Sequence, residues 1–246
     1  MLNEPTMDKL KALKLDAMAA AWAEQQKVAD MGKLAFDERL GLLVDAECLF
    51  RENRRLGRLL KEAKLKLGQA CIEDIDYPPK RELDKAVIRQ LATCRWVHEH
   101  QSVTITGPTG VGKTYVACAL AQHACRRGFS AMYRRASRLF DELTLARADG
   151  SYARLLSKLA RTDVLVIDDW GLTASREAER QDLLEILEDR YGTRSTILTS
   201  QIPREKWHDH LGDATVADAI LDRLIHNAHR IVINGPSRRK ENATAK

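Results

Sequence analysis

The feature that most restricts the fold of this chain is an eight-residue loop, residues 107–114, with the pattern Gly-x-x-x-x-Gly-Lys-Thr. A strand pattern at 102–106 leads into the loop, and a helical pattern at 113–127 follows it. A loop in this position directs its backbone N–H groups to one point at a helix N-terminus, where they attract phosphate. The loop therefore predicts a nucleotide-binding α/β domain. A glycine-rich turn without a ligand is the alternative.

Within this loop, each residue has an expected contact. Lys113 is expected to reach the outer phosphates of ATP, and Thr114 to help hold Mg²⁺. The other loop residues are expected to surround the phosphates: Gly107, Pro108, Thr109, Gly110, Val111 and Gly112. ATP and Mg²⁺ are thus the predicted cofactors.

A second strand pattern ends in two carboxylates. Four apolar residues, 164–167, are typical of a central parallel strand, and Asp168 and Asp169 follow them. Asp168 is predicted to bind on the metal side, and Asp169 to orient and polarise the attacking water. Asp169 is one methylene shorter than the glutamate that often has this role. The alternative is that both aspartates cap the following Trp170-Gly171 turn.

Strand and helix patterns alternate along the rest of this region. Further strands are expected at 129–133, 195–200 and 230–233, and helices at 137–148, 152–159, 176–191 and 214–227. Such alternation predicts a parallel sheet flanked by helices. The strand at 195–200 also ends in polar groups, Thr199, Ser200 and Gln201. Any of the three could sense the terminal phosphate or orient water, and the sequence does not rank them; a turn cap before Pro203 is the alternative.

The first part of the chain is expected to be a small all-helical domain, residues 1–70. Apolar residues follow helical spacing in one segment from Leu10 to Ala21 and in a second from Phe36 onward. The pattern breaks at Cys71–Pro79, where two adjacent prolines exclude a helix interior. We therefore expect a linker with a leading helix at 71–100 and the ATP-binding domain at 101–246. Only thirteen residues follow Ile233, so no C-terminal lid domain is expected.

Together these motifs resemble IstB-type proteins, which are AAA+ helper ATPases of bacterial insertion-sequence transposition related to DnaC helicase loaders. The resemblance spans roughly residues 70–240. It rests on the phosphate loop, on Asp-Asp-Trp-Gly at 168–171, on Thr-Ser-Gln at 199–201 and on the segment 219–231.

The resemblance implies an ATPase in the bacterial cytoplasm that forms oligomers on duplex DNA. Such a protein selects or remodels target DNA and recruits and stimulates its cognate transposase. On this analogy Gln201 is the first sensor, and Arg223 is an arginine finger supplied to a neighbouring subunit. The alternative for Arg223 is an intrahelical pair with Asp218 or Asp222. Without a lid domain a normal second sensor is not expected, and Arg238 or Arg239 are its candidate substitutes.

The charge pattern is compatible with DNA as a partner. Lys and Arg number 40 against 35 Asp and Glu, and aromatic residues, at 5%, leave little for stacking single-stranded bases. Basic residues cluster in two regions, 51–66 and 134–161. Neither region contains a base-reading motif, so phosphate contacts with little sequence preference are expected. Solvated helix faces are the alternative. The candidates are Arg51, Arg54, Arg55 and Arg58, then Arg134, Arg135, Arg138, Arg147, Arg154, Lys158 and Arg161.

Other features favour a cytoplasmic protein without a membrane partner. No apolar run approaches the length of about 18 residues that a membrane span needs, and the first ten residues lack a signal-peptide pattern. The five cysteines form no metal-ligand spacing, which favours reduced thiols.

Three other functions share parts of this pattern. A DnaC-type replicative helicase loader would use the same ATPase residues with a different partner on the N-terminal helices. A small-molecule kinase would also use a phosphate loop, but it would need a closing lid. A scaffold that binds ATP and hydrolyses it slowly or not at all is the third, which aspartate in place of glutamate at position 169 leaves open.

Overall fold

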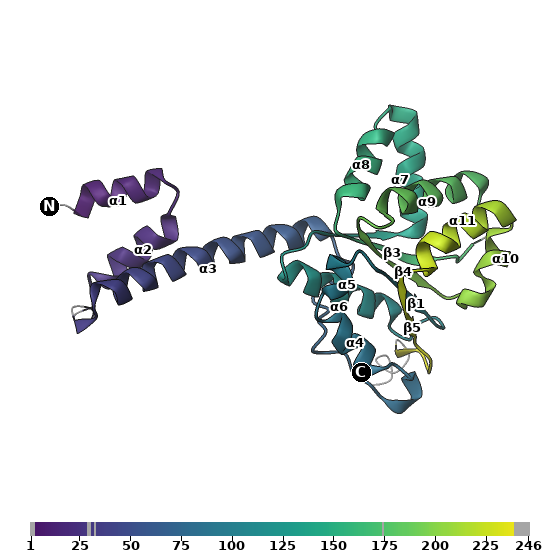
Figure 1. Cartoon of the computed structure of the whole chain (residues 1–246), viewed down its shortest axis with the longest axis horizontal. Helices are drawn as coiled ribbons and strands as arrows, with labels where there is room; N and C mark the ends of the chain where they lie inside the picture. Colours follow the sequence, from purple (N-terminus) through teal and green to yellow (C-terminus); the bar gives the residue numbers. More distant parts are fainter. Residues whose placement is uncertain (1–2, 29–30, 32, 174, 239–246) are drawn as a thin grey trace. The chain divides into compact units, whose positions relative to one another are not determined.

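The computed structural model describes residues 3–28, 31, 33–173 and 175–238, and they form two compact units (Figure 1). The first unit ends at Arg58 and the second begins at Leu59, so the division falls inside helix α3 (Phe36–Ala63). The sequence pattern places the domain boundary later, near residue 70. Leu59 and Ala63 are buried, and both belong to the second unit.

The first unit contains α1 (Asn3–Ala12), α2 (Asp16–Gln25) and most of α3. The expectation of one helical segment from Leu10 to Ala21 is wrong, because the chain turns between α1 and α2. Lys14 adopts a left-handed conformation, with φ of 57°, which ends a helix. The backbone N–H groups of Ala17 and Met18 donate to the Glu47 carboxylate at 3.0 Å, which links α2 to α3.

The second unit is built on a five-stranded parallel sheet, as the alternating pattern predicts. Its strands are β1 (Ser102–Thr106), β2 (Ala131–Arg135), β3 (Val164–Trp170), β4 (Ser195–Ser200) and β5 (Ala228–Val232). Their order is β2-β3-β4-β1-β5. Because β1, β4 and β3 are neighbours and parallel, their carboxyl ends meet at one edge of the sheet.

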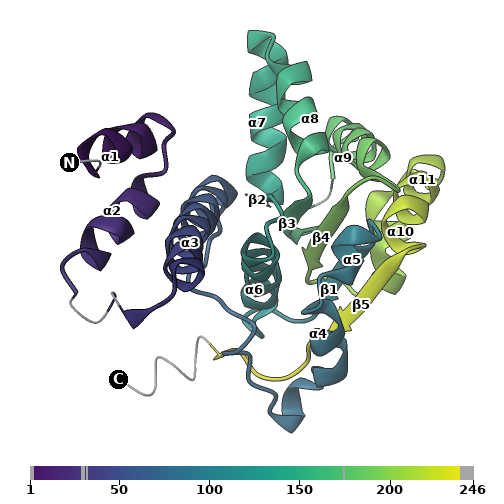
Figure 2. The same ribbon diagram turned by 60° about the vertical axis from the view of Figure 1, so that its left-hand side comes forward.

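Helices cover both faces of this sheet (Figures 1 and 2). One face packs against α6 (Lys113–Arg126), and the other packs against α7 (Ala136–Asp149), α8 (Tyr152–Arg161), α9 (Glu177–Arg190), α10 (Trp207–Leu211) and α11 (Ala214–Ile225). Leu165 and Ile167 of β3 belong to the buried cluster formed with α7 to α11. The intervening β3 residues point toward the α6 face, because side chains alternate along a strand.

The segment between α3 and β1 contains three short elements, whereas the sequence suggests one leading helix. These are η2 (Pro79–Arg81), α4 (Lys85–Leu91) and α5 (Arg95–His98). Cys94, with φ of 57°, separates α4 from α5, and Asp84 caps α4 by accepting from the Ala86 N–H. Another short helix, η3 (Arg204–Lys206), precedes α10. No lid domain follows β5 in the described residues, which end at Arg238.

Candidate nucleotide-binding site

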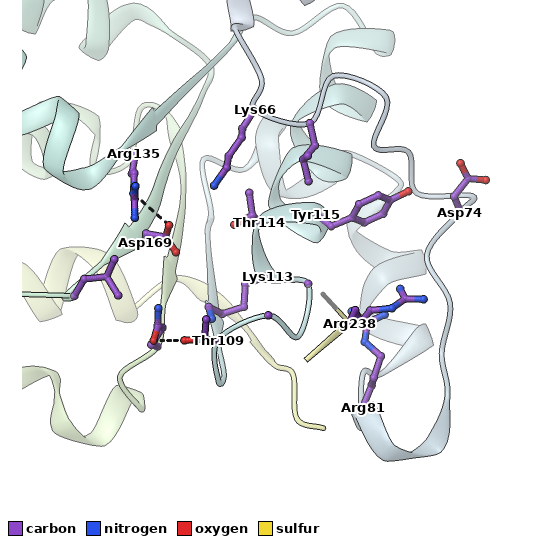
Figure 3. A pocket seen from close by; sticks show the side chains of 15 residues that line it. Lys66, Asp74, Arg81, Thr109, Lys113, Thr114, Tyr115, Arg135, Asp169 and Arg238 are labelled. Carbon is purple, nitrogen blue, oxygen red and sulfur yellow. Dashed lines mark hydrogen bonds and ion pairs between the residues drawn. The ribbon is translucent and has the colours of Figure 1, made fainter. Parts of the chain in front are cut away.

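A cavity of about 660 Å³ opens at the carboxyl edge of the sheet (Figure 3). The phosphate loop between β1 and α6 forms one wall, and residues at or just after the ends of β3 and β4 form another. The cavity therefore brings together motifs that are almost one hundred residues apart in the sequence.

The loop needs glycine at specific positions. Gly107 and Gly110 have φ values of 149° and 84°. A Cβ at Gly107 would lie 2.0 Å from the carbonyl oxygen of Ile233, and one at Gly110 would lie 2.1 Å from Ser237 Oγ. Any side chain at these positions would displace the segment after β5.

Lys113 is buried under the loop, at the first residue of α6. Its Nζ donates to the carbonyl oxygens of Gly107 and Pro108, both at 2.8 Å. This places a cation inside the curve of the loop, where a bound phosphate would lie.

Asp168 is fully buried and accepts hydrogen bonds from three hydroxyl groups. Thr114 Oγ1 lies 3.0 Å from both carboxylate oxygens, Tyr133 Oη donates to Oδ2 at 2.6 Å, and Thr199 Oγ1 donates to Oδ1 at 2.7 Å. Lys66 Nζ lies 3.9 Å from Oδ2. Burial and the hydrogen bond to Asp168 both raise the pKa of Tyr133. Within the described residues the Asp168 carboxylate bonds to neighbouring elements and not to the Trp170-Gly171 backbone, so Asp168 does not cap this turn.

The pairing of Thr114 with Asp168 fits a magnesium site. A hydroxyl and a carboxylate are hard oxygen donors of the kind that Mg²⁺ prefers. The described residues contain no group of three or more His, Cys, Asp or Glu side chains that could hold a metal by themselves. The protein thus offers two oxygen donors, which is typical of sites where Mg²⁺ also binds nucleotide phosphates and water.

Asp169 points away from Asp168 because the backbone changes conformation between them. It adopts a φ of 60°, and the register of β3 against β4 shifts between Ile167 and Trp170. Its N–H donates to Thr199 Oγ1 at 2.9 Å. Its carboxylate lines the cavity and lies 3.4 Å from Arg135 Nε.

The three polar residues at or just after the end of β4, Thr199, Ser200 and Gln201, have different positions. Thr199 donates to Asp168, while Ser200 Oγ donates to the Trp170 carbonyl at 2.9 Å. Gln201 lines the cavity and accepts from Thr109 Oγ1 at 2.6 Å through its Oε1. Of the three sensor candidates, Gln201 is the one that lines the described cavity.

Arg223 lies on α11 and does not line this cavity. Its Nη2 lies 2.9 Å from Glu188 Oε1 of α9, and its Nη1 donates to the Ala219 carbonyl at 3.0 Å. The alternative of a pair with Asp218 or Asp222 is wrong, because a carboxylate on the adjacent helix is the partner.

Sequence reasoning missed the residues that hold the phosphate loop in place through its backbone carbonyls. Arg81 is buried, and its Nη2 donates to the Val111 carbonyl at 2.8 Å while Nη1 donates to Asp76 Oδ1 at 2.8 Å. Arg238 donates to the same Asp76 carboxylate through both Nη atoms, and its N–H donates to the Gly110 carbonyl at 3.0 Å. No spacing in the sequence marks Arg81 or Asp76. Arg239, the other second-sensor candidate, lies outside the described residues.

The predicted DNA-contacting residues are distributed over both units. Those of the first unit are exposed on α3: Arg51, Arg54, Arg55 and Arg58. Arg51 Nε also bonds to Glu47 Oε1 at 2.7 Å. In the second unit, Arg138, Arg154, Lys158 and Arg161 are exposed, and Arg134 bonds to Glu142.

The guanidinium of Arg147 is engaged in contacts within the protein. It pairs with buried Asp182 and lies over the ring of Tyr152, 4.1 Å from the centroid. Because this cluster links α7, α8 and α9, Arg147 has a packing role in the described structure.

Comparisons with known proteins agree with this geometry. The sequence profile of a family described as IstB-like ATP binding protein matches residues 8–245. A Sinorhizobium fredii protein named as an insertion sequence ATP-binding protein is 49% identical over 240 residues, which cover 98% of this chain and 98% of that protein. The crystal structure of DnaI aligns with a TM-score of 0.59 and 25% identity, over 72% of this chain and 93% of that chain. The DnaC helicase loader aligns with a TM-score of 0.55 and 23% identity, over 67% and 97% of the two chains.

None of the helices in the described residues is both long and apolar enough to span a membrane.

Proposed function

Because the chain belongs to the family of IstB-like ATP-binding proteins, we propose that it hydrolyses ATP with Mg²⁺ while assembled on duplex DNA. In this proposal it assists transposition by selecting or remodelling target DNA and by recruiting and stimulating a transposase. The observation that carries the ATPase part is the contact between Thr114 of the phosphate loop and Asp168 at the end of β3.

The loop binds the phosphates of ATP in this proposal. Its backbone N–H groups and Lys113 Nζ contact the phosphate oxygens. To do so, Nζ gives up its hydrogen bonds to the carbonyls of Gly107 and Pro108. Thr114 and Asp168 would hold Mg²⁺, which would supply positive charge against the phosphates. Tyr133 and Thr199 fix the orientation of the Asp168 carboxylate.

Hydrolysis then requires an oriented water molecule. Asp169 accepts a hydrogen bond from that water and directs its oxygen toward the terminal phosphorus. The water oxygen forms a bond to this phosphorus as the bond between the phosphorus and the bridging oxygen breaks, and a water proton passes to Asp169 or to a phosphate oxygen, which gives ADP and phosphate. Gln201 contacts the terminal phosphate as a sensor, and Arg223 of a neighbouring subunit stabilises the developing charge.

DNA binding in this proposal relies on basic side chains of both units. The helical domain at 1–70 contributes contacts to DNA, to neighbouring subunits or to the transposase. Exposed arginines on α3 and basic residues on α7 and α8 contact backbone phosphates. Such contacts carry little sequence information, which suits a protein that accepts many target sites.

The test measures duplex DNA binding and ATP turnover of the purified chain. Affinity should require ATP, vary little among unrelated sequences and fall steeply between low and physiological salt. ATP turnover should rise when duplex DNA is added. A footprint confined to one sequence, or affinity independent of salt, would contradict the proposal. DNA binding without any ATP turnover would favour the alternative in which the protein is a scaffold that binds ATP without rapid hydrolysis.

A helicase loader is the second candidate, because 97% of the chain in the DnaC helicase loader structure aligns with this one. Both functions use the same ATPase residues and differ in partner. Purified chain with ATP should bind its cognate transposase and not a replicative helicase. Stable co-purification with the helicase alone would favour the loader.

A further inference from the structure

A second cavity of about 440 Å³ lies beside the nucleotide cavity, and its lining is strongly cationic. Its basic residues come from the segment after α3, the end of β2 and the start of α7: Lys64, Lys66, Arg134, Arg135 and Arg138. Glu142 is the one carboxylate in the described lining, and it already bonds to Arg134 Nε at 2.9 Å. The excess positive charge favours an anionic ligand.

Two of these cations, Lys66 and Arg135, line both cavities. Lys66 Nζ lies 3.9 Å from Asp168 Oδ2, and Arg135 Nε lies 3.4 Å from Asp169 Oδ2. Each shared cation is therefore paired with one of the two carboxylates that end β3. Figure 3 shows both cations at the nucleotide cavity, with Arg135 joined to Asp169.

The two shared cations are partly exposed, whereas their carboxylate partners are not: the side chains of Lys66 and Arg135 are 41% and 46% exposed, Asp168 is fully buried and Asp169 is 18% exposed. Asp168 would keep its hydroxyl hydrogen bonds if Lys66 moved, and both cations are accessible to an anion from solvent. Lys64 and Arg138 are exposed and form no ion pair within the described residues. An anion in the second cavity would contact Lys64 and Arg138. It would also compete with Asp168 and Asp169 for Lys66 and Arg135.

We propose that the second cavity binds a backbone phosphate of duplex DNA, and that this phosphate withdraws Arg135 from Asp169 and Lys66 from Asp168. The inference rests on the proposed function, which supplies duplex DNA as the source of the phosphate. Without DNA, Arg135 occupies the carboxylate that must accept a hydrogen bond from the attacking water. With DNA, Arg135 turns to the phosphate oxygens and Asp169 becomes available. DNA binding thereby raises ATP turnover through residues that belong to both cavities.

The first test uses Arg135→Gln in the full chain. Loss of the ion pair should raise turnover without DNA by on the order of fivefold, the factor that corresponds to about 1 kcal/mol. Addition of DNA should then stimulate turnover less than in the wild type. The slope of log DNA affinity against log salt should fall by about one, because one phosphate contact is lost. Arg135→Lys keeps the cation. It should largely retain the wild-type turnover without DNA, the stimulation by DNA and the salt slope, which a purely structural role of Arg135 would not predict.

The second test uses a cation that lines only the second cavity. Arg138→Ala should weaken DNA binding and reduce the salt slope by about one. The matched control is Arg89→Ala, which removes an exposed arginine of α4 and should leave turnover and DNA affinity unchanged. Inorganic phosphate in place of DNA should not raise turnover, because it lacks the adjoining phosphates that other basic residues contact.

The outcomes separate this inference from the proposed function. If the wild type binds DNA and is stimulated by it, while Arg135→Gln and Arg138→Ala behave like Arg89→Ala, the second cavity is not the coupling site. If inorganic phosphate alone stimulates the wild type and not Arg135→Gln, the ligand is a free anion and the DNA assignment is overturned. If the wild type binds no duplex DNA with ATP, the proposed function itself is overturned.

Discussion

Asp168 illustrates how single residues determine this site. A buried carboxylate without partners would cost several kcal/mol, whereas hydrogen bonds to a charged group each contribute about 1.5–3 kcal/mol. Asp168 receives such bonds from Thr114, Tyr133 and Thr199, which belong to three different elements. The carboxylate therefore has a fixed orientation toward the loop, and its neighbour Asp169 is free to take a different direction.

At the scale of single residues, substitution of Lys113 is expected to impair ATP binding and substitution of Asp168 to impair ATP turnover. Lys113→Ala removes the cation within the loop and should weaken ATP binding by about a hundredfold, as expected for a lost contact worth about 3 kcal/mol. Asp168→Asn should retain nucleotide within a few-fold but lose most turnover. Calorimetric titration with ATP and a phosphate-release assay measure these two properties.

The matched control for this pair is Lys206→Ala, which removes an exposed lysine of η3. Thermal melting of each variant checks that the chain folds. Undiminished ATP affinity in Lys113→Ala would refute the phosphate site, and normal turnover in Asp168→Asn would refute its metal-side role.

At the scale of elements, Arg190 connects α8, α9 and β4. It is almost fully buried at the end of α9, and its guanidinium donates to the carbonyls of Leu159, Thr162 and Ser195 and to Thr196 Oγ1. These acceptors lie where α8 ends and where β4 begins. One side chain thus satisfies backbone groups that would otherwise be buried without partners.

Arg190→Met is expected to destabilise the second unit by about 3 kcal/mol or more, because several buried carbonyls lose their donors together. Urea unfolding followed by tryptophan fluorescence gives the change in the free energy of unfolding. Arg161→Ala, at an exposed position of α8, serves as the control and should change it by less than about 0.5 kcal/mol. Equal stability of the two variants would show that the Arg190 contacts are dispensable.

At the scale of the whole molecule, the position of Arg223 bears on assembly. Its guanidinium is bonded within its own chain to Glu188 and does not line that chain's nucleotide cavity. An arginine finger in this position acts only if it reaches the terminal phosphate of another subunit. The ATPase would then depend on oligomers.

Mixing two inactive variants tests this dependence. Arg223→Ala should bind ATP and hydrolyse it poorly, whereas Lys113→Ala lacks a functional loop but still offers Arg223 to its neighbour. A mixture should recover part of the turnover, since some interfaces combine an intact loop with an intact arginine. The assay uses duplex DNA and protein concentrations that permit assembly.

The control mixture combines Lys113→Ala with the Lys113→Ala/Arg223→Ala double variant, which provides no intact loop. If mixed oligomers form and the test mixture is no more active than this control, Arg223 does not act in trans. Its pair with Glu188 would then be a structural link between α9 and α11.

The sequence by itself determined the features that depend on local geometry. The phosphate loop, the two carboxylates near the end of β3 and the parallel alternation of strands and helices follow from backbone conformation and from the spacing of apolar residues. The bounds of β1 and β4 agree with the sequence pattern for the same reason. The break between α1 and α2 was not evident, because apolar residues keep helical spacing across the three residues that separate the helices, among them the left-handed Lys14.

Only the tertiary structure decided which distant side chains meet. Tyr133 reaches Asp168 because β2 lies beside β3, and Arg223 pairs with Glu188 because α11 packs on α9. Lys66 and Arg135 line the same two cavities because the segment after α3 lies close to the end of β2. Such contacts depend on strand order and helix packing, and many residues of the same type are available along the chain. The fold selects among them, and the selected residues connect the nucleotide site to the rest of the molecule.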